Sequence, residues 1–174
     1  MPIKFCAQCG TALTLQIESG RERPVCPNCG FVVYRNPAPV GLVVATQDEK
    51  LLLVHRVNPP LAGYWAPPTG YIEIDESVEE GTARETKEET GLDVAVEKLL
   101  GLYSRANVGV TMAVYAGRVL GGKLAFDEKE VDEVRFFARD ELPVQIAPVN
   151  GKPIDYWFYQ LVQQIFKEFR EKRL

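Results

Sequence analysis

The chain has 174 residues, of which 46% are hydrophobic and 25% are charged, and its formal net charge is −4. These values are typical of a globular protein with one main domain and a small additional one. They exclude a collagen, a disordered tail and a disulfide-rich toxin, and because no apolar run approaches about 20 residues they also exclude a membrane protein.

Charge and the first residues also bear on partners and location. An acidic chain has no general attraction for the phosphate backbone, so nucleic acid is not expected as a partner. The residues after Met1 contain no hydrophobic signal segment, and this predicts a cytoplasmic protein.

All four cysteines lie near the amino terminus, in two Cys-x-x-Cys pairs that are each followed by a glycine: Cys6, Cys9, Cys26 and Cys29. This spacing is typical of a structural zinc site with four thiolates, in which the glycine can adopt a positive φ. Two disulfides are the alternative, but nothing in the sequence indicates export. We predict a zinc ribbon over residues 1–35 that needs Zn²⁺ to fold and serves as a scaffold or a dimer contact.

The middle of the chain predicts strands, a loop and a helix. Residues 36–39 read as a linker, and two apolar runs at 40–45 and 51–55 predict a hairpin. Residues 57–69 form a proline-rich loop. A helix begins near Ser77, where Glu80 can complete a capping box, and stops at Gly91.

The last third predicts three strands, at 95–104, 110–119 and 134–137, and a short helix near Arg139. From residue 154 to 169, apolar side chains recur at helical spacing, and this predicts a long helix that packs on the core. Mixed strands and helices favour an α/β/α or α+β sandwich.

The segment 76–89 holds six glutamates and two basic residues, so its net charge of −4 equals that of the whole chain. On a helix, Glu85, Glu88 and Glu89 project within an arc of about 100°. Carboxylates this close repel one another unless a cation lies between them. Mg²⁺ or Mn²⁺ accepts oxygen ligands and shares phosphate oxygens, so a metal platform for a phosphorylated substrate is one interpretation. A solvated acidic face is the other.

The order of residues favours the metal platform. Over 23 residues the segment resembles the signature of the Nudix hydrolases, which act on nucleoside diphosphates linked to another moiety; the matching positions are Gly70, Glu76, Arg84, Glu85, Glu88, Glu89, Gly91 and Leu92. Two positions depart from the pattern. Thr86 stands where an aliphatic residue is usual, and Thr69 stands where the family commonly has a first glycine.

The resemblance implies a Nudix α/β/α sandwich with a mixed β-sheet over residues 36–174 and hydrolysis by a metal-activated water. It implies that the metal ligands are Glu85, Glu88, Glu89 and the carbonyl of Gly70, with Arg84 as an orienting group paired with Glu76. A carboxylate outside the signature completes such sites. Glu130 is the first candidate for this role and Glu133 is the alternate.

The substrate is less well defined. A zinc ribbon ahead of a Nudix domain is similar to the NADH pyrophosphatases, but their Ser-Gln-Pro-Trp-Pro-Phe-Pro signature is absent, and Val108 stands where many ADP-ribose pyrophosphatases have a proline. The combination also resembles a group linked to ADP-ribose and FAD cleavage. We therefore rank ADP-ribose and FAD first, followed by NADH and nucleoside triphosphates.

Candidate substrate contacts are aromatic side chains that could stack on a base and arginines that could bind phosphate: Tyr64, Trp65, Tyr103, Arg56, Arg105 and Arg118. His55 is not expected to take part in catalysis. A homodimer is common in the family. The alternative function is a Nudix-fold ligand sensor without catalysis, or an interaction module that acts through the zinc ribbon.

Overall fold

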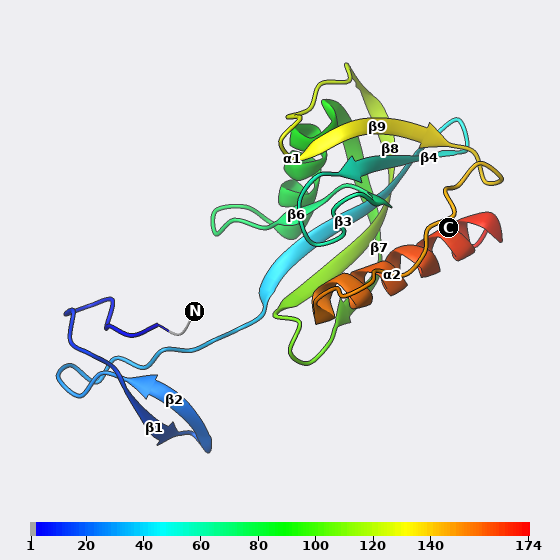
Figure 1. Cartoon of the computed structure of the whole chain (residues 1–174). Coiled ribbons are helices and arrows are strands. Elements are labelled where there is room, and N and C mark those ends of the chain that lie inside the picture. The colour runs from blue at the N-terminus through cyan, green and yellow to red at the C-terminus, as the bar shows by residue number, and fades with distance from the viewer. Residues whose placement is uncertain (1–2) are drawn as a thin grey trace. The chain divides into compact units, whose positions relative to one another are not determined.

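The computed structural model describes residues 3–174, which divide into two compact units between Asn36 and Pro37. The first unit is built on a two-stranded antiparallel hairpin of β1 (Thr14–Glu18) and β2 (Arg21–Val25), with Ser19 and Gly20 in the turn at positive φ. Two loops that contain the cysteine pairs flank this hairpin (Figure 1).

The second unit is a mixed sheet with one helix on each side (Figure 1). Its elements are β3 (Ala38–Gln47), β4 (Lys50–Arg56), β5 (Trp65–Ala66), β6 (Thr69–Tyr71), α1 (Val78–Thr90), β7 (Leu92–Ser104), β8 (Val110–Gly122), β9 (Val131–Phe137) and α2 (Pro153–Arg170). The main strand order is β5-β4-β3-β8-β7, with β6 paired to β3 and β9 paired to β4. Only β3 and β8 run parallel; the other pairs are antiparallel.

The sheet opens between β3 and β4. These strands form the predicted hairpin around Asp48 and Glu49, both at positive φ, but they pair only at its tip, through Thr46 with Leu51 and Gln47 with Lys50. Beyond the tip, the short strand β5 pairs with β4, and β6 pairs with β3. The proline-rich segment therefore lies in the opening, and side chains from both helical layers can reach it.

Alternation along the strands creates two cores. Leu42 and Val44 of β3 pack with the apolar stripe of α2, while Val43 and Ala45 pack on the side of α1. The α2 stripe is buried as predicted, and α1 covers the other face. The fold is the α/β/α sandwich with a mixed sheet that the sequence indicated.

The helix α1 starts and ends as its local sequence predicts, with a capping box of Ser77 and Glu80 and a left-handed Gly91 at its end. Its sheet-facing side carries threonines whose hydroxyls donate to the carbonyl one turn earlier; these are Thr82, Thr86 and Thr90. Thr86 is thus fully buried with its polar atom satisfied, which is how it replaces the usual aliphatic residue.

The structure differs from three predictions about elements. The prediction of a short helix near Arg139 is wrong. Residues 139–141 form only a turn, because Pro143 follows after Leu142 and the Arg139 side chain donates to the Phe169 carbonyl. The strand β5 lies inside the predicted proline-rich loop of residues 57–69, and β6 begins at the last residue of that loop. β3 begins at Ala38, inside the predicted linker, where the amide donates to the Gly109 carbonyl.

Candidate functional site

A cleft of about 320 Å³ lies where the sheet opens. Its lining includes Glu85 and Glu89 of α1, Gly70 of β6, Arg56 of β4 and Glu130 just before β9. Residues from the first turns of α2 line it as well. Of the three carboxylates of α1 predicted to share one site, Glu85 and Glu89 therefore line this cleft, whereas Glu88 is exposed and lies outside the lining.

Glu89 is the most buried carboxylate of the cleft, with 6% of its surface exposed. The Thr69 amide donates to its Oε2 at 2.9 Å, and Nη1 of Arg56 lies 3.4 Å from its Oε1. Burial raises the pKa of Glu89 to about 7, and the nearby charges of Glu85 and Glu130 act in the same direction. Arg56 and the Thr69 amide oppose this shift. Glu89 is thus a carboxylate of the cleft that has little exposure to solvent.

Glu85 lies directly over Gly70. A Cβ added to Gly70 would stand 1.9 Å from Cδ of Glu85, so this position accepts only glycine while Glu85 keeps its place. Burial raises the pKa of Glu85, and Arg84 lowers it. The close approach also places the backbone of β6 against the Glu85 carboxylate, as a shared ligand site would require.

Arg84 connects the acidic residues around it. Its guanidinium bonds both oxygens of Glu76 at 2.7 and 2.9 Å, Oε1 of Glu85 at 2.9 Å and Oε2 of Glu88 at 3.0 Å. It also donates to the Tyr71 carbonyl. The hydrogen bonds from Arg84 and the Glu73 amide lower the pKa of Glu76 to about 2. The predicted Arg84–Glu76 pair is therefore present, and it fixes α1 to the segment that precedes it.

The structure separates the two candidates for the additional carboxylate. Glu130 lines the cleft, and its carbonyl accepts the Val57 amide at 2.9 Å. Glu133 is exposed on β9, opposite His55, and does not line the cleft. His55 itself pairs with Asp132 at 2.6 Å, outside the lining.

The predicted substrate contacts are divided in the same way. Arg56 lines the cleft, but Tyr64, Trp65 and Arg105 do not. Tyr64 meets Tyr159 edge-on, Trp65 packs against Phe137, and Arg105 is exposed in the turn between β7 and β8.

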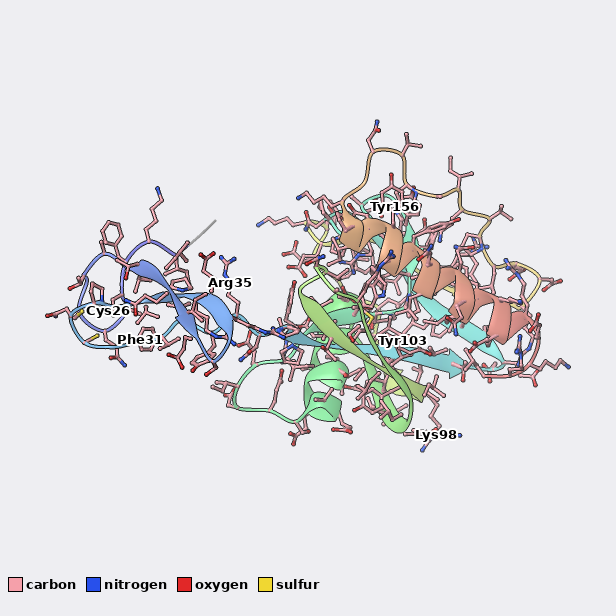
Figure 2. All side chains as sticks on the ribbon, turned by 90° about the horizontal axis from the view of Figure 1, so that it is seen from below. Cys26, Phe31, Arg35, Lys98, Tyr103 and Tyr156 are labelled. Atoms are coloured by element: carbon pink, nitrogen blue, oxygen red, sulfur yellow. The ribbon has the colours of Figure 1, made fainter. Side chains whose placement is uncertain are left out.

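Two further candidates also lie outside the lining. Tyr103 packs on the core and Arg118 pairs with Glu97, and neither residue reaches the cleft. Tyr103 is labelled in Figure 2.

Sequence reasoning missed three residues of α2 that line the cleft: Ile154, Trp157 and Phe158. They belong to the helical stripe that was assigned to core packing. Their periodicity is the same as that of the buried residues that follow. The only sequence signal for their place in the cleft is their position at the amino end of the stripe. That position indicates a cleft residue only once the packing of the helix on the sheet is known.

The four cysteines form the one group of potential metal ligands, within residues 3–174, whose ligand atoms all lie within 4.8 Å of one another. Their Sγ–Sγ contacts of 3.5 and 3.6 Å are near the edge of about 3.8 Å expected for four sulfurs around Zn²⁺. All four are free thiols, which contradicts the disulfide alternative. Gly10 and Gly30 have the predicted positive φ, 71° and 75°. Cys26 is labelled in Figure 2.

The carboxylates of α1 that were predicted to bind metal do not form so tight a group, and each of them is paired with an arginine. Glu85 and Glu88 share the Arg84 guanidinium, and Glu89 faces Arg56. Their donor chemistry nevertheless fits Mg²⁺, which needs only one or two carboxylates when waters and substrate phosphates supply the remaining oxygens. Buried carboxylates with raised pKa values are the groups that gain most from such a cation.

Comparison with known proteins gives a consistent result. The description "NUDIX domain" matches residues 35–158, and "Nudix N-terminal", a zinc ribbon, matches residues 4–35. An ADP-ribose pyrophosphatase of Methanocaldococcus jannaschii is 38% identical over 117 residues, which cover 65% of this chain and 69% of that protein. The NAD-capped RNA hydrolase NudC of Stutzerimonas stutzeri is 30% identical over 141 residues, which cover 80% of this chain and 50% of that protein. The chain thus spans about half the length of this relative.

Solved structures agree with the fold. A NUDIX hydrolase from Nitrosomonas europaea superposes with a TM-score of 0.82 at 29% identity, covering 98% of this chain and 92% of that one. An ADP-ribose pyrophosphatase from Streptococcus suis superposes with a TM-score of 0.54 at 28% identity, covering 75% and 92%. No helix among the described residues has the length and apolar character needed to cross a membrane.

Proposed function

Because the chain belongs to the Nudix hydrolase family, we propose that it hydrolyses the diphosphate linkage of a nucleoside diphosphate joined to another moiety, with the help of a divalent cation. The observation that carries this proposal is the convergence of Glu85, Glu89 and Glu130 with Gly70 and Arg56 on one cleft. Carboxylates gathered in this way, with Glu89 buried among them, match a cation-dependent phosphate site.

The residues divide the work as follows. Glu85 and Glu89 would hold Mg²⁺ or Mn²⁺ together with the Gly70 carbonyl, with Glu88 alongside and Glu130 completing the site. When bound, the metal neutralises the diphosphate and lowers the pKa of a water molecule.

The chain's own groups prepare this arrangement. Arg84 orients Glu85, and the Thr69 amide orients Glu89. Arg56 is partly buried beside Glu89 and would offer a guanidinium to the phosphate.

The four cysteines would hold a structural Zn²⁺, since four thiolates leave no open position for catalysis. The ribbon would then act as a scaffold or as a contact in a homodimer, which remains a prediction, as does the cytoplasmic location.

The substrate ranking follows the relatives. ADP-ribose stands first because the relative from Methanocaldococcus jannaschii and the Streptococcus suis structure are both named ADP-ribose pyrophosphatases. FAD is kept beside it, with NADH and nucleoside triphosphates behind. One relative is named NAD-capped RNA hydrolase, so the expectation that nucleic acid is not a partner is not supported. A dinucleotide-capped RNA therefore joins the candidate substrates.

The experiment is a substrate panel with the full chain and Mg²⁺: ADP-ribose, FAD, NADH, a triphosphate and an NAD-capped RNA, assayed for released monophosphate. We expect turnover of ADP-ribose. Glu89→Gln abolishes it, Glu130→Gln slows it, and Glu133→Gln, a matched carboxylate outside the cleft, leaves it unchanged. Absence of turnover on every compound would favour the silent sensor. Normal rates in Glu89→Gln would contradict the role of that residue.

A further inference from the structure

The loop that carries Glu130 is held along its backbone, although its residues are exposed. The Lys129 amide donates to Oδ1 of Asp127 at 2.9 Å, and the Lys129 carbonyl accepts Nδ2 of Asn58 at 2.7 Å. The Glu130 amide donates to the Asp127 carbonyl at 2.9 Å, and the Glu130 carbonyl accepts the Val57 amide at the same distance. All four backbone groups are therefore paired within the protein, whereas exposed loops are usually more mobile than the strands they join.

On the other side of Glu130, the strand β9 lies beside β4 (Figure 1), and their pairing contains a bulge. Val131 lies opposite Arg56. The residue before Arg56 on β4 is His55, and it lies opposite Glu133 rather than Asp132. Asp132 is therefore the extra residue of the bulge. A bulge bends its strand, and next to an active site it redirects a side chain.

The side chain of this extra residue is bound to β4. Oδ1 of Asp132 lies 2.6 Å from Nδ1 of His55, and because a carboxylate can only accept a hydrogen bond, Nδ1 donates it. The His55 ring packs against Trp65 with ring centres 5.2 Å apart, and the backbones of these two residues pair between β4 and β5. The bend of β9 is thus fixed to a central strand, two residues after Glu130.

The pair of His55 and Asp132 contributes little to the stability of the fold. Their side chains are 28% and 54% exposed, and ion pairs with such exposure stabilise a protein only weakly. Neither residue lines the cleft, so a contact with a substrate bound there is not expected. The pair does fix the bulge, and the segment that leads from the bulge into the cleft carries Glu130.

We infer that His55 and Asp132 are positioning residues, which hold Glu130 where its carboxylate completes the catalytic site. This inference rests on the proposed function, since it takes Glu130 to act there. A group that is fixed before the substrate binds needs no rearrangement during the reaction, and a displacement of about 1 Å can lower a rate about 10²-fold. Asn58 and Val57 hold the amino-terminal side of the segment, and the pair holds the other side.

The first test compares Asp132→Ala with Glu133→Ala, its exposed neighbour on β9, in the hydrolysis of ADP-ribose with Mg²⁺. We expect kcat to fall about tenfold in Asp132→Ala while KM stays within about threefold, because the groups that line the cleft remain. Asp132→Asn keeps an acceptor for His55 and should stay within about threefold of the wild-type kcat. Glu133→Ala should match the wild type. A wild-type kcat in Asp132→Ala would overturn the inference.

The second test asks whether the loss of activity passes through Glu130. In a Glu130→Gln background the positioned carboxylate is absent, so the addition of Asp132→Ala should lower kcat by less than about twofold. His55→Phe keeps a ring against Trp65 but has no Nδ1 donor, so it should behave like Asp132→Ala in both backgrounds. A further tenfold loss in either double variant would show that the pair acts on another part of the protein, and the inference would be wrong.

The third test needs no substrate. The Val57 amide donates to the Glu130 carbonyl, so its hydrogen exchange reports how firmly this segment is held. We expect exchange at Val57 to be about tenfold faster in Asp132→Ala than in the wild type or Glu133→Ala, with Tm changed by no more than about 2 °C. Unchanged exchange at Val57 would contradict the inference, because the segment would then be held without the pair.

The two proposals can fail separately. If no compound is hydrolysed but exchange at Val57 rises in Asp132→Ala, the proposed activity is wrong and the pair still holds the segment. If Glu130→Gln is as active as the wild type, the proposed role of Glu130 is wrong and the inference falls with it. If hydrolysis of ADP-ribose needs Glu130 and Asp132→Ala changes neither kcat nor exchange, the activity stands and the assignment of the pair is wrong.

Discussion

The buried carboxylate of Glu89 should make the metal-free protein less stable as pH rises. Its pKa in the folded chain is about 7, compared with 4.5 for an unperturbed glutamate, and burial is the main cause. The contribution of this group to stability is therefore fully present below pH 4.5 and is lost as pH rises through 7. At 1.36 kcal/mol per unit of pKa, the ionised carboxylate costs roughly 3 kcal/mol, and roughly 2–3 kcal/mol of this appears between pH 5 and pH 8.

The assay is urea denaturation at pH 5 and pH 8, without added divalent cation, of the wild type, Glu89→Gln and the exposed control Glu133→Gln. The amide is nearly isosteric and keeps an acceptor for the Thr69 amide, so Glu89→Gln should lack this part of the pH dependence, whereas the control should follow the wild type. Saturating Mg²⁺ should reduce the loss in the wild type. Equal pH dependence of the wild type and Glu89→Gln would refute the reasoning from burial.

Three other perturbations follow from the geometry. Gly70→Ala brings a methyl group onto Glu85; we expect activity to fall by about tenfold or more with little change in Tm, and normal activity would contradict the close approach. Thr86→Val removes a buried hydroxyl that bonds the Thr82 carbonyl; urea denaturation should show a change below about 1 kcal/mol, and a larger loss would show that the hydroxyl is needed. Removal of Zn²⁺ by a chelator, followed by return of Mg²⁺, should raise hydrogen exchange in residues 1–35 alone; increased exchange in the second unit would show that it depends on the ribbon.

The features that the sequence predicted are those that local chemistry decides. The bounds of α1 follow from a cap at Ser77, a reciprocal bond from Glu80 and a left-handed Gly91, all within one or two turns of the residues concerned. The burial of α2 follows from apolar residues at helical spacing. The cysteine cluster follows from two tight turns that each direct a pair of sulfurs to one point. None of these depends on how distant segments meet.

The features that it missed depend on contacts between distant segments. Trp65 follows prolines and stands beside Tyr64, so the sequence predicted an aromatic side chain in a loop that is free to stack on a base. It instead pairs with β4, and Gln145, 80 residues away, holds its backbone through both its amide and its carbonyl. Trp157 shows the reverse case. It lies in the apolar stripe of α2 and is buried in the core, yet it also lines the cleft that forms where β3 and β4 separate.

The opening between β3 and β4 explains why one cleft can have two chemical characters. In a continuous sheet, a carboxylate on α1 and an indole on α2 would lie on opposite faces, separated by the strands. Because β3 and β4 pair only at their hairpin, Glu89 of α1 and Trp157 of α2 line the same cleft, as does Arg56. A substrate that spans the cleft must contact both layers. Substitutions on the α2 side should therefore change KM, and those on the α1 side should change kcat, and this separation of effects can be measured without knowledge of the cellular substrate.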